Sequence, residues 1–288
     1  MTEYNYYRIS YSSLPSLGKF YPEGSSIRFR CLTIRDLKYL ASINEKNSRE
    51  VVNDIIQRAI KLEKLKFTSI LEMDRLTLVF FIRTNTFMLS NEYQTEFDCP
   101  YCGKRVMKTF QVSDLAKRSI NESKIKQCTI GDKTISGVYY KISDMAFDTG
   151  DPDIDLIMNW TNYREIKSST TNEDIVNEIL SLPADDFSRI KSVANSARCG
   201  ILGYAIMDCD GCGEKMRVGV SLRDRQLFNH VQLTTVIKNR IQVSKYCGID
   251  LSDDTPFNEV EMTIAVVNDL SKKEAEACEK RNRGVSSV

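Results

Sequence analysis

The chain has 288 residues, 42% of them hydrophobic, with 40 basic and 39 acidic residues and a formal net charge of +1. This apolar content is enough for a substantial core, which excludes a disordered or fibrous chain. The balanced charge excludes an overall field that would steer the protein to nucleic acid or to an anionic membrane, although it leaves a local basic patch open.

The apolar runs argue against a membrane-spanning or secreted protein, and the cysteines indicate the redox compartment. The apolar run at residues 78–82 ends at Arg83, far short of the roughly 20 residues that a membrane span requires. The first residues lack the basic and apolar segments of a secretory signal. Five of the nine cysteines are scattered without a pairing pattern, which favours a reducing compartment. These five are Cys31, Cys128, Cys199, Cys247 and Cys278.

The first 90 residues predict two strands followed by three helices. Alternating apolar and polar residues indicate the strands, and apolar residues at helical spacing indicate the helices. Capping-box patterns that start at Thr33 and Ser69 begin the first and third helices. The third helix is apolar around most of its circumference, so we expect it at the centre of a helical core. The strands are residues 6–11 and 26–32, and the helices are residues 34–41, 48–61 and 70–88.

The rest of the chain predicts two cysteine-bearing hairpins, short elements between them, and helices toward the C-terminus. The hairpins pair residues 92–98 with 106–112 and residues 201–207 with 216–222. Between them we expect a short helix at 114–119, strands at 126–130 and 134–142, an exposed acidic connection at 148–155 and a loop at 167–172. The segment around Trp160 fits either a helix or a strand. Later helices are expected at 172–180, 185–197, 221–248 and 257–283.

Together these elements predict an α+β fold: a helical core with short β-hairpins, two of them carrying zinc knuckles that close a zinc-ribbon-like site. We divide the chain into an N-terminal extended or β segment (1–34), an N-terminal helical core (35–90), a first knuckle hairpin (91–119), a β-rich or irregular insertion (120–172), helices with the second knuckle hairpin (173–222), and C-terminal helices (223–288).

The most specific chemistry lies in two nearly identical stretches that read Asp-Cys-x-x-Cys-Gly, at residues 98–103 and 208–213. Each places two thiols at the spacing of a zinc knuckle, followed by a glycine where the chain must turn sharply. Zinc prefers four thiolates in a tetrahedron, and loop-closure entropy grows slowly enough to permit a long intervening segment. The sequence therefore predicts one structural zinc shared by Cys99, Cys102, Cys209 and Cys212.

Other states of these cysteines stay open at this point. The knuckles could remain metal-free, as reduced thiols or as disulfides in the isolated protein. Redox catalysis is disfavoured because both pairs are expected at hairpin tips and not at helix N-termini, where a thiolate is stabilised. A site with four cysteine ligands leaves no open position for water, so a catalytic zinc is not expected.

No other motif indicates an enzyme. Asp151, Asp153 and Asp155 imitate the first ligands of a calcium loop, but Leu156 and Asn162 occupy the positions of its glycine and glutamate, so we expect a solvated loop. The single histidine, at position 230, is expected in a core or an interface. Glycine loops of the Walker or Rossmann type are absent from the sequence.

The stretch from Leu14 to Pro22, followed by residues 27–30 and 32–36, resembles the opening of the T-even-type bacteriophage baseplate hub and hub-assembly family. The family's pattern is a proline-bounded entry, a strand, a helix start, a helical core and then a cysteine hairpin. The resemblance covers roughly residues 10–115. It implies structural or assembly work in the central hub of a contractile tail, located in the virion baseplate and assembled in the host cytoplasm.

The resulting hypothesis is a non-enzymatic component that contacts other phage baseplate and tail proteins within a symmetric assembly, without a membrane or nucleic acid. Its expected partner-binding residues belong to the proline-bounded stretch: Leu14, Pro15, Leu17, Gly18, Phe20, Tyr21 and Pro22. The alternative is a zinc-ribbon protein that binds nucleic acid or assists transcription. Basic residues beside the knuckles could form its contact patch, and these are Lys104, Arg105, Lys108, Lys215 and Arg217.

Overall fold

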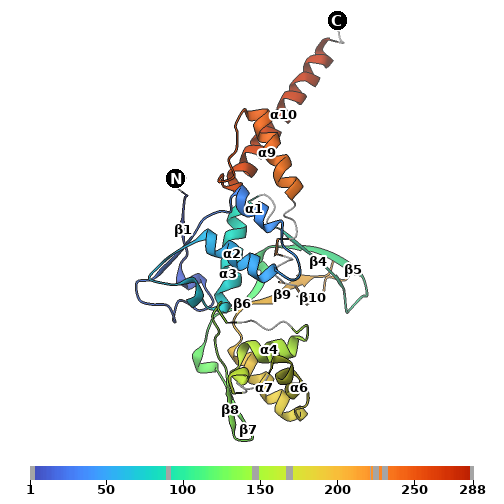
Figure 1. The fold of residues 1–288 in the computed structure, drawn as a ribbon. Helices are drawn as coiled ribbons and strands as arrows, with labels where there is room; N and C mark the ends of the chain where they lie inside the picture. Colours follow the sequence, from blue (N-terminus) through green and yellow to red (C-terminus); the bar gives the residue numbers. More distant parts are fainter. Residues whose placement is uncertain are drawn as a thin grey trace.

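The computed structural model describes residues 4–88, 92–144, 149–166, 171–220, 222, 227–228 and 233–285. Figure 1 shows a central helical body, the cysteine hairpins beside it, a smaller lobe below and two helices above. The fold mixes helices with small antiparallel sheets, as the α+β prediction states. No described helix is both long enough and apolar enough to cross a membrane.

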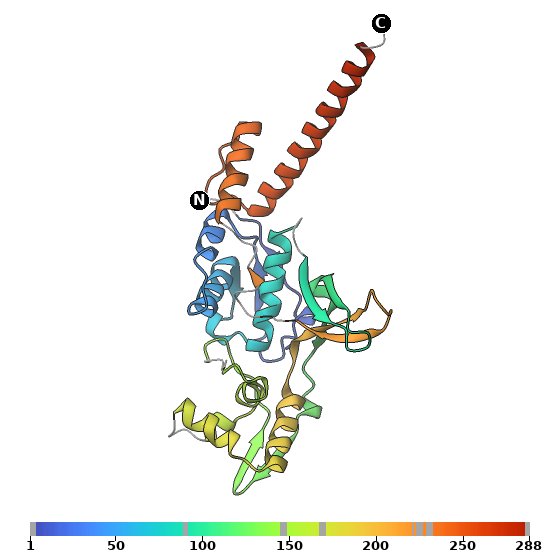
Figure 2. The ribbon, with the colours of Figure 1, turned by 90° about the vertical axis from the view of Figure 1, so that its right-hand side faces the viewer.

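The central body is built from a three-stranded sheet and three helices. The sheet has the antiparallel order β1 (Tyr7–Arg8), β2 (Ser26–Phe29), β3 (Ile60–Glu63). The helices are α1 (Ile34–Leu40), α2 (Ser48–Ala59) and α3 (Glu72–Thr86). Buried residues of α3 lie in the largest apolar cluster, which draws on residues from Ile9 to Val260. The central position of α3 in Figure 2 agrees with the burial of apolar residues on several of its faces, among them Leu78, Val79 and Phe80.

The predicted helix starts have different outcomes. At α1 the capping box is confirmed, because Thr33 accepts from the amide of Asp36 and the Asp36 carboxylate accepts from the amide of Thr33. The capping box predicted at Ser69 is wrong, since α3 begins after Leu71, which makes no side-chain cap. The third strand was missed: residues 60–63 leave the apolar spacing of α2 and pair with β2.

The first cysteine hairpin is β4 (Tyr93–Asp98) with β5 (Arg105–Phe110), and the second is β9 (Gly200–Asp208) with β10 (Lys215–Gly219). A short strand, β6 (Leu115–Arg118), joins β9 and makes the order β10-β9-β6. The helix predicted at 114–119 is therefore wrong: Leu115 pairs with Ala205, and sheet pairing has overridden the local sequence pattern.

The lower lobe has its own apolar cluster, built mainly from four helices and a hairpin. The hairpin is β7 (Gln127–Ile130) with β8 (Lys133–Ser136), so the strand predicted at 134–142 ends early. The helices are α4 (Pro152–Trp160), α5 (Tyr163–Ile166), α6 (Asn172–Leu180) and α7 (Ala184–Ala197). The acidic connection predicted at 148–155 is partly helical, because the Asp151 carboxylate caps α4 and Pro152 suits its first turn.

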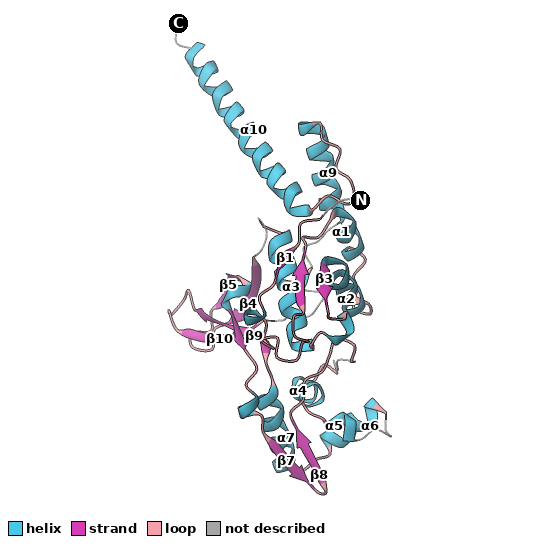
Figure 3. Cartoon of the chain, turned by 90° about the vertical axis from the view of Figure 1, so that its left-hand side faces the viewer, coloured by secondary structure: helices cyan, strands magenta, loops and turns pink. Residues whose placement is uncertain are grey.

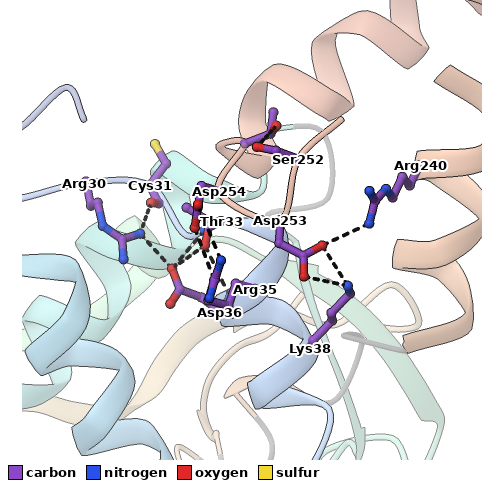
Figure 4. Close-up of polar contacts among 11 residues, drawn as sticks. Arg30, Cys31, Thr33, Arg35, Asp36, Lys38, Arg240, Ser252, Asp253 and Asp254 are labelled. Carbon is purple, nitrogen blue, oxygen red and sulfur yellow. Dashed lines mark hydrogen bonds and ion pairs between the residues drawn. The ribbon is translucent and has the colours of Figure 1, made fainter. Parts of the chain in front are cut away.

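Two helices at the C-terminal end, α9 (Leu233–Cys247) and α10 (Phe257–Val285), are held on α1 by the segment between them. Figure 4 shows Asp253 between Lys38, at 2.8 Å, and Arg240, at 2.9 Å. The amide of Ile34 also donates to the carbonyl of Thr255. Beyond this anchor α10 projects away from the body (Figure 1). Gly248 ends α9 with a left-handed φ of 65°, which confirms the predicted stop.

Candidate metal centre

The two knuckles have the same backbone hydrogen bonds. The amide of Cys99 donates to the carbonyl of Lys104, and the amide of Gly103 donates back to the carbonyl of Cys99. In the second knuckle the amide of Cys209 donates to the carbonyl of Glu214, and the amide of Gly213 donates to the carbonyl of Cys209. Both glycines have left-handed φ values, 70° for Gly103 and 75° for Gly213, which residues with a side chain rarely adopt. The repeated sequence therefore forms the same tight turn twice.

These turns bring all four predicted cysteines together, with every Sγ within 4.8 Å of the others. The Sγ atoms of Cys99 and Cys212 lie 3.8 Å apart, and those of Cys102 and Cys209 lie 3.7 Å apart. A tetrahedron with zinc–sulfur bonds of about 2.3 Å has sulfur–sulfur edges of about 3.8 Å. A disulfide needs about 2 Å. The arrangement has the dimensions of a metal site built from free thiols.

Burial and local dipoles also suit a metal thiolate site. Cys99 and Cys209 are buried, whereas Cys102 and Cys212 are exposed. The amides of Gly211 and Cys212 donate to the sulfur of Cys209 and lower the pKa of this thiol to about 7. Against the lowering effect of the Glu214 amide, desolvation and hydrogen bonds with the other cysteines raise the pKa of Cys212 to about 12. A lower pKa favours the thiolate, which is the form that binds a metal.

A small apolar core supports the site from below. Val106 of the first hairpin and Met216 and Val218 of the second are buried with Cys99 and Cys209. Across the two hairpins, Lys108 forms an ion pair with Asp210. A metal bound here would join residues from both cysteine hairpins into one unit.

The stretch from Leu14 to Pro22 divides into a buried base and an exposed tip. Leu14, Pro15 and Tyr21 are buried in the chain's own core, so in this fold they are unavailable to a partner. Leu17 and Phe20 are 39% and 49% exposed, and Pro22 is exposed beside them. Gly18 is half-buried, with a φ of 73° and no room for a Cβ against the ring of Tyr11.

A buried carboxylate that the sequence analysis missed holds this loop. Asp74 of α3 accepts hydrogen bonds from the Ser16 amide at 2.9 Å, the Ser16 hydroxyl at 2.5 Å and the Tyr21 hydroxyl at 2.6 Å. Burial raises the pKa of Asp74, and burial beside Asp74 raises the pKa of Tyr21. The available signal was an acidic residue in the first turn of a helix expected at the centre of the core, where a buried carboxylate needs partners.

Two other features singled out in the sequence carry no site in the described structure. Asp153 pairs with Lys191, and the Asp155 carboxylate accepts from the amide and hydroxyl of Thr149. The acidic residues that resemble a calcium loop therefore lie at the start of helix α4 and have partners within the chain. The histidine at position 230 lies outside the described residues.

A family model described as T4 bacteriophage base plate protein matches residues 6–228. The matched span includes the loop at Leu14–Pro22, the Asp74 anchor and both cysteine hairpins, and it ends before α9. No curated protein and no solved structure matches the chain. Since the family model covers well over half of the residues, the chain belongs to the T4 bacteriophage base plate protein family and is a structural component of a phage tail baseplate.

Proposed function

We propose that this protein is a structural or assembly component of the central hub of the baseplate, that it acts through protein–protein contacts and that it performs no catalysis. The resemblance of Leu14–Pro22 and residues 27–36 to hub proteins supports the hub position, and both stretches lie inside the family match. In this proposal the protein is assembled in the host cytoplasm and resides in the virion tail as part of a symmetric complex.

Zinc is the proposed metal at the four cysteines. Four thiolates at tetrahedral spacing favour zinc over magnesium or calcium, which prefer oxygen ligands. Cys99, Cys102, Cys209 and Cys212 would fill all four positions, so the ion would stabilise the fold and hold no substrate. The role of zinc is then to fix the two cysteine hairpins relative to each other.

The observation that carries the proposed protein contacts is the presentation of Leu17. This residue has a φ of 55°, a region that costs a residue other than glycine on the order of 1 kcal/mol, and its side chain still faces solvent. Phe20 lies beside it, with its ring centre 5.6 Å from that of Tyr139. The hydrogen bonds to Asp74 fix the base of the loop that carries the two apolar side chains. Because the loop is already ordered, a partner that binds these side chains does not have to order it, and the entropic cost of binding is small.

The nucleic-acid alternative depends on the basic residues beside the knuckles. Arg105 pairs with Glu96 at 2.5 Å, and Lys108 pairs with Asp210. Each ion pair reduces the positive charge available for a phosphate backbone. Two of the five basic residues are thereby occupied, which leaves a smaller patch for the nucleic-acid alternative.

The test compares the tagged full chain with Leu17→Ser, Phe20→Ser and the control Met107→Ser, each expressed together with the phage baseplate proteins. Met107 is 64% exposed on β5, so its substitution also removes an exposed apolar group. We expect the wild type and the control to purify with hub proteins, identified by mass spectrometry. The amount of hub protein recovered with each of the two loop variants should fall at least tenfold, while their thermal midpoints stay the same.

Two results would contradict the proposal. One is equal recovery of hub proteins with all four chains. The other is binding of the purified protein to a DNA duplex with an affinity that falls steeply as salt rises, without recovery of tail proteins, which would support the nucleic-acid alternative.

A further inference from the structure

Three arginines gather where the lower lobe meets the sheet of the second hairpin. Arg118 ends β6, Arg198 follows α7, and Arg217 lies in β10. One Nη of Arg118 donates to the carbonyls of Asn195, at 2.7 Å, and Arg198, at 3.2 Å, so its guanidinium is fixed at the end of α7. The guanidinium carbon of Arg217 lies 3.5 Å from the ring centre of Tyr204.

These positive charges have no acidic partner within the described part of the chain. None of the ion pairs there includes Arg118, Arg198 or Arg217. Burial and the neighbouring charges of Arg118 and Arg217 lower the pKa of Arg198, so Arg198 lies in the electrostatic field of the other two. Like charges held together cost free energy that an external carboxylate would recover.

An exposed apolar residue lies next to these charges. Ile206 pairs directly with Arg217 across the two strands and is 68% exposed. We name this surface the arginine face, consisting of Arg118, Arg198, Arg217, Tyr204 and Ile206. Fixed guanidinium groups beside an aromatic ring and an aliphatic side chain are a combination typical of protein interfaces. The aliphatic group favours a protein partner over the phosphates of nucleic acid.

The complementary surface is present on the same chain. Residues 171–188, which form α6 and the start of α7, contain five acidic and no basic residues. Glu173 and Asp185 are exposed and make no ion pair in the described structure. Leu180, at the end of α6, is 61% exposed. We name this surface the acidic edge, consisting of Glu173, Leu180 and Asp185. The other three carboxylates are engaged within the chain: Asp186 pairs with Arg189, Asp174 accepts from Thr171 in the capping box of α6, and Glu178 accepts from the hydroxyl of Tyr163.

The two surfaces cannot meet within one molecule. Figure 3 shows α6 at one side of the chain and the β9–β10 hairpin at the other, with α7 between them. Complementary charged and apolar groups on separate sides of one chain allow two copies to pair head to tail. Such contacts form a ring when the rotation between copies closes, and a filament when it does not.

We propose that the arginine face binds the acidic edge of a second copy of this protein. Carboxylates of the acidic edge pair with the guanidinium groups, and Leu180 packs near Ile206. Because the charged groups remain partly solvated, the association weakens as salt rises.

Sedimentation velocity of the full-length, zinc-loaded chain tests this proposal over a range of concentrations. We expect the mass of the wild type to increase with concentration, and Arg217→Glu or Asp185→Arg to weaken association at least tenfold. Arg105→Glu, at an exposed position of β5 where the substitution breaks the pair with Glu96, is the charge-reversal control and should associate as the wild type does.

Mixing the two interface variants gives the decisive result. Each retains one intact surface, and the two altered surfaces have opposite charges, so an equimolar mixture should regain association that neither variant shows alone. Three results would overturn the proposal: a wild type that stays monomeric at all concentrations and at low salt, interface variants that associate as the wild type does, or a mixture without recovery. An Arg217→Glu variant that loses affinity for a DNA duplex but associates normally would assign the arginine face to nucleic acid and also overturn it.

Discussion

The Sγ atoms of Cys102 and Cys209 lie 3.7 Å apart, although 107 positions separate the two residues in the chain. Each cysteine belongs to a separate hairpin, and the folded body and the packed hairpin faces bring the two tips together. Metal binding at this point would therefore depend on the tertiary fold as well as on the local turns.

We expect the purified, reduced protein to contain one zinc per chain, and Cys99→Ser or Cys209→Ser each to remove most of it. Loss of about 3 kcal/mol of stability would lower the thermal midpoint of a chain of this size by roughly 5 °C. Elemental analysis and thermal denaturation measure the two effects. Cys128→Ser removes a thiol outside the cluster and should change neither the zinc content nor the midpoint by a comparable amount. A full zinc complement in either cluster variant would refute a shared site.

The pair of Arg30 and Asp36 predicts a large effect of a single substitution. Arg30 donates to Asp36 at 2.7 Å, and both side chains are almost fully buried. Asp36→Ala leaves a buried guanidinium without its carboxylate and removes the carboxylate half of the capping box of α1, so we expect a loss of roughly 3–5 kcal/mol in the free energy of unfolding. Glu122→Ala breaks the exposed pair with Lys19 and should cost less than about 1 kcal/mol. Urea denaturation compares the two; similar losses would contradict the prediction.

Asp74 predicts a defined dependence of stability on pH. Its pKa is raised by burial above the ordinary value of 3.8, so between these two values the folded protein binds more protons than the unfolded chain. The contribution of this group to stability is therefore largest at low pH and decreases as pH rises through the raised pKa.

The test is the difference in unfolding free energy between the wild type and Asp74→Asn, measured from pH 4 to pH 7. We expect this difference to shift in favour of the wild type as pH is lowered, because only the wild type can take up a proton there. The exposed Asp132→Asn variant is the control. A shift in the opposite direction would show that the hydrogen bonds from Ser16 and Tyr21 outweigh the burial of the charge.

Asp253 predicts the local stability of the C-terminal helices. It accepts from Lys38 and Arg240, and the hydrogen bond from Lys38, together with the positive charges of Lys38 and Arg240, lowers the pKa of Asp253. Its stabilising effect is thus present at neutral pH and is lost as pH falls through the lowered pKa. Asp253→Asn should accelerate amide hydrogen exchange in α9 and the first turns of α10, while α2 and α3 exchange as in the wild type. Uniform acceleration throughout the chain would instead indicate global destabilisation.

The sequence by itself determined the local elements whose physical causes are short-range. The capping box at Thr33, the amphipathic spacing of α2, the glycine that ends α9 and the repeated Asp-Cys-x-x-Cys-Gly turns depend on neighbours within a few residues, and the structure has them where they were predicted. The four metal-binding candidates followed from the repeat, because the chemistry of zinc requires two pairs.

Only the tertiary structure decided the features that depend on distant partners. Leu115–Arg118 forms a strand because β9 offers an edge, and residues 60–63 do so because β2 lies beside them. Leu14 and Tyr21 entered the core while Leu17 remained exposed, because Asp74, far along the chain, supplies the acceptor that fixes the loop. The arginine face and the acidic edge likewise lie on separate sides because of the way the lobes pack. Strand pairing and burial depend on contacts that the local sequence does not encode.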